Sequence, residues 1–115
     1  MTKSVGELNI EKCLLNHNIP FISQFSFNRD KRKKYDFAIL NDKQEIIRLV
    51  EFDGKQHFIQ DTNTWFKSDT LETRQERDAI KNNYAKQANI PLVRIPYWER
   101  DTITLDIIMG DKYEI

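Results

Sequence analysis

The distribution of apolar positions predicts three strands in the first half of the chain. Residues 46–50 (IIRLV) form a run in which β-branched residues predominate, as is typical of a buried strand. Residues 35–40 (YDFAIL) form another apolar run, and residues 41–43 are expected to make the turn between the two strands. Residues 21–27 (FISQFSF) alternate in part and predict a first strand, with Phe21, Phe25 and Phe27 on one side.

A helix is expected before these strands, at residues 4–16. Ser4 and Glu7 have the spacing of a capping box, in which each residue satisfies a backbone N–H of the other. The apolar side of this helix is expected to consist of Leu8, Ile10, Leu14 and Leu15.

The second half of the chain predicts a polar helix followed by a buried strand. At residues 69–89, the stripe expected to face the core is Ile80, Tyr84 and Ala88. Residues 92–95 (LVRI) predict a fourth strand, and residues 104–109 a short closing helix. A helix followed by a strand suggests a crossover connection. The expected fold is therefore α/β, with a mixed central β-sheet of about four strands flanked by helices.

Length, charge and cysteine content exclude several classes of protein. A chain of 115 residues predicts a single domain spanning residues 1–115. The formal net charge is zero, so nucleic-acid binding would require a local basic patch. No apolar run approaches the length of a membrane span, and the first residues lack a signal peptide, so a cytoplasmic location is expected. The single Cys13 excludes an internal disulfide and a cysteine-rich zinc site.

Carboxylates interrupt the apolar runs of two neighbouring strands. Glu51 and Asp53 are two residues apart, so on a strand they point to the same face, and Asp36 lies within the preceding apolar run. Neighbouring carboxylates repel each other unless a cation lies between them. Their oxygen ligands suit Mg²⁺, with Mn²⁺ as a substitute. These three residues therefore predict a metal site, the alternative being acids on an exposed strand face.

Polar residues after this strand provide further candidates for catalysis. Gly54 allows a sharp turn that would bring Lys55, Gln56 and His57 to the same rim. His57 could accept the proton of an attacking water, and Lys55 could stabilise negative charge on a phosphorus atom. A zinc hydrolase fits less well because only one histidine is suitably placed.

A basic segment precedes the second strand. It is expected to be either a solvated hairpin loop or a rim that contacts phosphates, and its basic residues are Arg29, Lys31, Arg32, Lys33 and Lys34.

Three motifs together resemble a known nuclease superfamily. They are residues 50–57 (VEFDGKQH), 77–84 (RDAIKNNY) and 92–98 (LVRIPYW), preceded by Gly6-Glu7 with Ile10 and Leu14 at matching spacing. The chain resembles the PD-(D/E)XK nucleases, and more closely the Vsr-like branch with the very-short-patch repair endonuclease and the EDxHD homing endonucleases. It is also similar to short phage-encoded endonucleases, which would place it in a host-cell cytoplasm.

The resemblance implies a Vsr-like nuclease core and Mg²⁺-dependent hydrolysis of DNA. The enzyme would be of homing or repair type, and it could either nick one strand or cut both. It implies an active centre of Glu7, Asp36, Asp53 and His57, with Glu51 and Gln56 at further matching positions. Asp78 and Lys81 are ranked second, because the helical period turns Asp78 away from Ile80 and Tyr84.

The chain also departs from the family in two respects. One cysteine cannot form the repair enzyme's structural zinc site, so no zinc is expected. The additional DNA-binding regions of the homing enzymes are lacking, so sequence specificity would be low or supplied by a partner. The expected partner is DNA and not a membrane, and monomer and homodimer both remain open. The alternatives are a catalytically silent nucleic-acid-binding module on the same fold and a structural subunit of a phage assembly.

Overall fold

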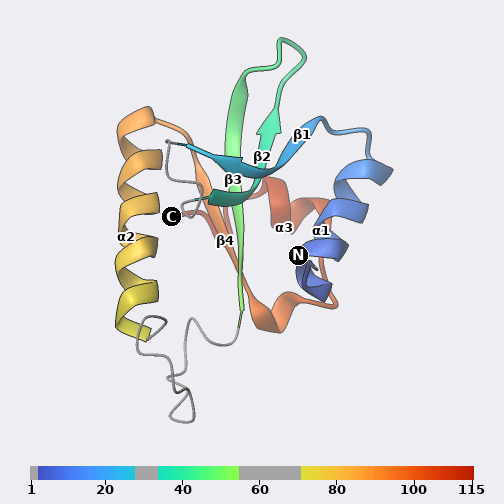
Figure 1. The fold of residues 1–115 in the computed structure, drawn as a ribbon. Helices are drawn as coiled ribbons and strands as arrows, with labels where there is room; N and C mark the ends of the chain where they lie inside the picture. Colours follow the sequence, from blue (N-terminus) through green and yellow to red (C-terminus); the bar gives the residue numbers. More distant parts are fainter. Residues whose placement is uncertain (1–2, 28–33, 55–70) are drawn as a thin grey trace.

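The computed structural model describes residues 3–27, 34–54 and 71–115 (Figure 1). Its elements are, in chain order, α1 (Val5–Asn16), β1 (Phe21–Ser26), β2 (Lys34–Leu40), β3 (Ile46–Asp53), α2 (Leu71–Ala88), β4 (Leu92–Pro96), the 3₁₀ helix η3 (Tyr97–Glu99) and α3 (Leu105–Met109). Within these residues, we find no helix with the length and apolar character needed to span a bilayer.

The strands form one mixed sheet in the order β1-β2-β3-β4. The first three strands are antiparallel neighbours, whereas β4 runs parallel to β3. The chain between β3 and β4 includes α2, which covers one face of the sheet, while α1 and α3 lie on the other face (Figure 1). The predicted α/β class, the four-stranded mixed sheet and the crossover are therefore confirmed.

Each face of the sheet has its own hydrophobic cluster. The cluster under α1 and α3 consists of Ile10, Leu14, Phe37, Ile39, Val50, Phe52, Val93, Ile95 and Ile108. The cluster under α2 is smaller and consists of Tyr35, Ala38, Leu49, Ala85 and Leu92. Farther along β3, the α2 face carries Glu51 and Asp53 after Leu49. On β4, it carries Arg94 after Leu92.

The N-terminus of α1 begins as expected but buries a narrower stripe. The Ser4 hydroxyl accepts a hydrogen bond from the Glu7 backbone N–H at 3.3 Å, and it lies 3.3 Å from the Glu7 carboxylate, to which it donates. Ile10 and Leu14 are fully buried. Leu8 and Leu15 are 40% and 59% exposed, so their predicted place in the core was wrong. The buried residues of α1 are Gly6, Ile10 and Leu14, which form a single line along the side of the helix that contacts the sheet.

The prediction that Phe21, Phe25 and Phe27 share one side was also wrong. Phe21 packs against the cluster under α1, whereas Phe25 and Phe27 pack against the cluster under α2. The change of face occurs at Gln24, which adopts a left-handed conformation with φ of 55°. The alternation of a regular strand does not continue through such a residue.

The predicted core stripe of α2 was wrong at two of its three positions. Ile80 is 40% exposed and Ala88 is exposed. Among the side chains of residues 75–88, the buried one is Ala85, while Tyr84 is partly buried and packs against the cluster under α2. The inward side of the preceding turns is polar because it faces charged residues of β3 and β4. Hydrophobic periodicity therefore identified Tyr84 but not the polar side chains that face the sheet.

The outer edge of β4 is covered by the C-terminal residues. The Arg94 backbone N–H donates to the Tyr113 carbonyl at 3.0 Å, and the Ile115 N–H donates to the Leu92 carbonyl at 2.9 Å. These bonds satisfy backbone groups that a sheet edge would otherwise leave exposed.

Candidate functional site

Charged side chains gather on the α2 face, where β3 and β4 approach their carboxyl ends. Glu51 and Asp53 are only 4% and 7% exposed, and both contact residues on this face, as their spacing predicted. Arg94 is paired with Glu51 in the parallel register of β3 and β4. Buried charges of this kind are stable only when they are paired and hydrogen-bonded.

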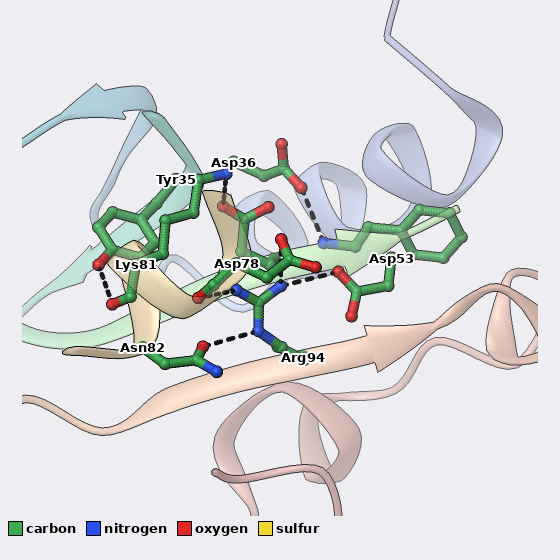
Figure 2. A network of polar contacts seen from close by, with 9 residues as sticks. Tyr35, Asp36, Asp53, Asp78, Lys81, Asn82 and Arg94 are labelled. Atoms are coloured by element: carbon green, nitrogen blue, oxygen red, sulfur yellow. Dashed lines mark hydrogen bonds and ion pairs between the residues drawn. The ribbon is translucent and has the colours of Figure 1, made fainter. Parts of the chain in front are cut away.

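Arg94 links both neighbouring elements to β4. Its Nη1 lies 3.0 Å from Asp53 Oδ1 and 3.3 Å from Asp78 Oδ1 (Figure 2). Its Nε donates to Asn82 Oδ1 at 3.0 Å, and its Nη2 donates to the Asp78 carbonyl at 3.3 Å. One guanidinium therefore compensates two carboxylates and holds α2 against the sheet.

Lys81 provides the second internal cation. Its Nζ donates to Glu51 Oε1 at 2.6 Å, and its carbonyl accepts a hydrogen bond from the Tyr35 hydroxyl at 2.6 Å. Burial and the charge of Asp36 nevertheless raise the pKa of Glu51 well above its ordinary value, although Lys81 and Arg94 act in the opposite direction. Burial, followed by the charge of Glu51, raises the pKa of Tyr35.

Asp36 lies at the point where the ladder between β2 and β3 ends. The last paired residues on this side are Phe37 and Val50. Beyond them, Asp36 Oδ2 accepts a hydrogen bond from the Phe52 backbone N–H at 2.7 Å (Figure 2). The side chain thus fixes the end of β3 and places a carboxylate between the two strands.

Glu7 lies on α1 and interacts with Asp36. It is partly buried, and burial followed by the negative charge of Asp36 raises its pKa, while the Ser4 hydroxyl and Lys3 lower it. Glu11, one turn later, is instead 2.9 Å from Lys3 Nζ. Glu7, Asp36 and Glu51 therefore form a series of interacting acids that runs from α1 to the α2 face.

The structure brings several predicted site residues together and leaves others undescribed. The residues in this group, together with their internal cations, are Glu7, Asp36, Glu51, Asp53, Asp78, Lys81 and Arg94, and we call them the acidic cluster. The predicted Lys55, Gln56 and His57 lie outside the described residues, as do Arg29, Lys31, Arg32 and Lys33. Lys34 is described as the first residue of β2, paired with Ser26.

Two features of the acidic cluster were missed or misplaced from the sequence. Asp78 was expected to face away from the packed side of its helix, but it faces the sheet and contacts Arg94. Arg94 and Asn82 were not predicted at all. The available signal was a charge within the apolar run LVRIP, which is the same signal that identified Asp36. Residues 78, 81 and 82 also share one helix face.

The cluster has the donor type of a Mg²⁺ site but is compensated internally. Among the described ranges, no three His, Cys, Asp or Glu side chains are grouped so that they could hold a metal ion. Asp53 and Glu51 are held by Arg94 and Lys81. Burial, followed by the negative charge of Asp36, raises the pKa values of Glu7 and Glu51. Carboxylate oxygens there fit a hard divalent cation, if the internal cations give up their partners.

Comparison with known proteins places the chain in a family. Residues 22–107 match the family described as "Protein of unknown function (DUF2726)". This span contains the acidic cluster except Glu7. Comparisons with curated proteins and with solved structures gave no match. Since the family match extends over well more than half of the chain, the protein belongs to the DUF2726 family.

Proposed function

We propose that this protein is a Mg²⁺-dependent DNA endonuclease built on a PD-(D/E)XK, Vsr-like core. The observation that carries the proposal is the acidic cluster itself. Acids from α1, β2 and β3 meet at one end of the sheet, where burial, followed by the negative charge of Asp36, raises the pKa of both Glu7 and Glu51. A protein that needed these residues only for stability would gain little from placing like charges together.

Asp36, Glu51 and Asp53 would hold the ion once Lys81 and Arg94 release Glu51 and Asp53, because these three carboxylates are not grouped around a metal position as they stand. When bound, Mg²⁺ supplies Lewis-acid polarisation of the phosphodiester and acidifies a bound water. Lys81 and Arg94 already lie beside these carboxylates, so their donors could transfer to phosphate oxygens of a DNA strand. The exchange would keep each buried charge paired throughout binding.

Glu7 and His57 would handle protons. The raised pKa of Glu7 brings this carboxyl closer to neutrality, where an acid can both bind and release a proton. His57 follows β3 closely in the sequence and would be the general base, a role that imidazole groups commonly have. In this scheme, Lys55 and Gln56 would contact the scissile phosphate. The basic residues at positions 29–34 would contact the neighbouring phosphates of the DNA.

Relaxation of a supercoiled plasmid in Mg²⁺, Mn²⁺ or EDTA tests this function. Asp36→Asn and Asp53→Asn should lower cleavage by at least about a hundredfold, or roughly 2.7 kcal/mol of transition-state stabilisation. Asparagine retains an oxygen that can accept from the Phe52 N–H, so Asp36→Asn should still fold. Asp42→Asn, an exposed turn residue, is the matched control and should cleave like the wild type. Full cleavage by Asp36→Asn and Asp53→Asn would refute the proposal.

One observation favours a second candidate, a nucleic-acid-binding module without catalysis. Lys81 and Arg94 bind Glu51 and Asp53 at 2.6 and 3.0 Å, as expected of a permanent structural network. Such a module would bind DNA equally well in Mg²⁺ and EDTA and would leave the plasmid supercoiled. The same assay, combined with a binding measurement, therefore separates the two functions.

A further inference from the structure

A concave surface lies beside the acidic cluster, at the carboxyl ends of β3 and β4. It is a pocket of about 460 Å³ between the first turn of α1, the end of β3 and the segment that follows β4. We call it the α1–η3 pocket, and its lining includes Gly6, Phe52, Gly54, Trp98 and Arg100. In Figure 1, the segment that follows β4 passes beside the start of α1.

The pocket presents a large aromatic side chain to solvent. Trp98 is 60% exposed, although tryptophan is usually well buried. Its ring centroid lies 5.3 Å from that of Tyr97, at an interplanar angle of 80°. Phe52 adds apolar surface to the pocket lining. An exposed aromatic surface of this kind suits a flat, apolar ligand group.

The segment that carries Trp98 is firmly anchored. The Glu99 carboxylate accepts hydrogen bonds from the Thr102 hydroxyl at 2.5 Å and from the Tyr113 hydroxyl at 2.6 Å. On the other side, Asn9 Nδ2 donates to the Arg100 carbonyl at 2.8 Å. A backbone that is already ordered loses little conformational entropy when a ligand binds to it.

The pocket is continuous with the acidic cluster along the chain. Gly6 precedes Glu7, and Gly54 follows Asp53, so the two sites share the first turn of α1 and the end of β3. Arg100 adds a cation whose contact with Asp101 is 3.5 Å long and solvent-exposed. Exposed pairs of this type are weak, so Arg100 can exchange its partner for a phosphate.

We infer that the α1–η3 pocket binds an unpaired base of a nucleic acid by stacking on Trp98, with Arg100 at the adjacent phosphate. The inference rests on the proposed function and specifies its substrate class, which is single-stranded or locally unpaired DNA. A base inside a continuous duplex is stacked on both faces and cannot lie against an indole without first leaving the stack. The acids nearby disfavour binding by phosphate charge alone, so stacking has to contribute.

Fluorescence anisotropy with a labelled oligothymidylate and a duplex of equal length, both in EDTA, tests the inference without cleavage. Trp98→Ala should weaken binding of the single strand about tenfold, or roughly 1.4 kcal/mol, and binding of the duplex less than about twofold. Trp98→Phe should retain most of the affinity because it keeps a π face. Leu15→Ala removes an apolar side chain of similar exposure, 59%, and should change neither affinity.

Trp98→Leu extends the test if Trp98→Ala fails to fold, since leucine keeps apolar bulk without a π face and should bind the single strand as weakly. Unchanged single-strand binding by Trp98→Leu or Trp98→Ala, or equal losses on the single strand and the duplex, would overturn the inference. A wild type that binds through Trp98 without cutting DNA would retain the inference and remove the proposed nuclease. If the wild type cuts DNA but the Trp98 variants bind the single strand as well as it does, the proposed nuclease is retained and the stacking inference is overturned.

Discussion

Glu51 is a buried carboxylate whose neighbours act on it in opposite directions. Burial and Asp36 raise its pKa, while Lys81 and Arg94 lower it, and the net effect is a pKa well above the ordinary range. The folded protein therefore binds a proton at Glu51 more readily than the unfolded chain does. By linkage, this contribution to the free energy of unfolding is fully present below the unfolded pKa and is lost as pH rises through the folded pKa.

Glu51→Gln should flatten this dependence. We expect the melting temperature of the wild type to fall as pH rises from about 5 to about 8, and that of the variant to fall less, because a carboxamide does not ionise. Thermal unfolding followed by circular dichroism across this range measures both. The control is Glu45→Gln, an exposed turn residue that should leave the wild-type slope unchanged. Identical slopes for the wild type and Glu51→Gln would show that Glu51 stays ionised.

At the residue scale, the sequence predicted the acids and ranked Lys81 second, but it did not predict Arg94. Asp36, Glu51 and Asp53 were identifiable because a charge within an apolar run is costly and needs a partner. Arg94 also interrupts an apolar run, but its partners Asp78 and Asn82 come from a helix whose orientation the sequence did not reveal. Local spacing shows that a buried charge needs a partner, whereas the partner itself depends on how distant elements pack.

At the element scale, α1 is positioned by a close contact with the sheet. A Cβ atom at Gly6 would lie 2.2 Å from Cζ of Phe52, well inside van der Waals distance. The glycine therefore allows the first turn of the helix to approach β3, which places the next residue, Glu7, near Asp36. Helix propensity and packing make opposite demands at this position.

Gly6→Ala tests which demand dominates. Alanine favours a helix by about 1 kcal/mol over glycine, whereas overpacking costs about 1–3 kcal/mol. Because Phe52 is only 9% exposed and has little room to move, we expect the variant to lose about 1–2 kcal/mol in free energy of unfolding, measured in urea. Adding Phe52→Leu should relieve the clash, so the double variant should lose less than the two single losses combined. A more stable Gly6→Ala would contradict this view of α1.

The second prediction for α1 distinguishes the roles of Glu7 and Glu11. Glu7→Gln keeps a side chain that can accept from the Ser4 hydroxyl, but it cannot titrate. We expect it to melt no lower than the wild type and to lose at least about tenfold in cleavage rate, or roughly 1.4 kcal/mol. Glu11→Gln, which loses only a contact with Lys3, should cleave normally. Loss of activity in Glu11→Gln alone would shift the active centre by one helical turn.

Element identity was predictable from the sequence, whereas the orientation of some elements was not. The four strands, the crossover and the two terminal helices follow from apolar runs, caps and turn residues. The orientation of α2 does not, because its inward side carries Asp78, Lys81 and Asn82 opposite a charged part of the sheet. The turn of β1 at Gln24 also escaped prediction, since a left-handed glutamine has no distinct local pattern.

At the scale of the whole molecule, the two faces of the sheet are stabilised differently. The α1 and α3 side has the larger apolar cluster, whereas the α2 side combines a small cluster with ion pairs. Burying charges contributes little net stability even when they are paired, so the first side must carry most of the hydrophobic stabilisation. In the proposed function, the α2 side is the one whose ion pairs would exchange partners on binding.

A divalent cation should stabilise the whole domain through this exchange. An ion that binds the folded state but not the unfolded state adds about 1.4 kcal/mol when its free concentration is tenfold above Kd, which corresponds to an increase in melting temperature on the order of 5 °C for a domain of this size. We expect Mg²⁺ to raise the wild-type melting temperature by this order, and to raise those of Asp36→Asn and Asp53→Asn by less. Asp42→Asn should respond like the wild type. Equal shifts in all four proteins would place the bound ion elsewhere, and the acidic cluster would then be a structural network neutralised by Lys81 and Arg94.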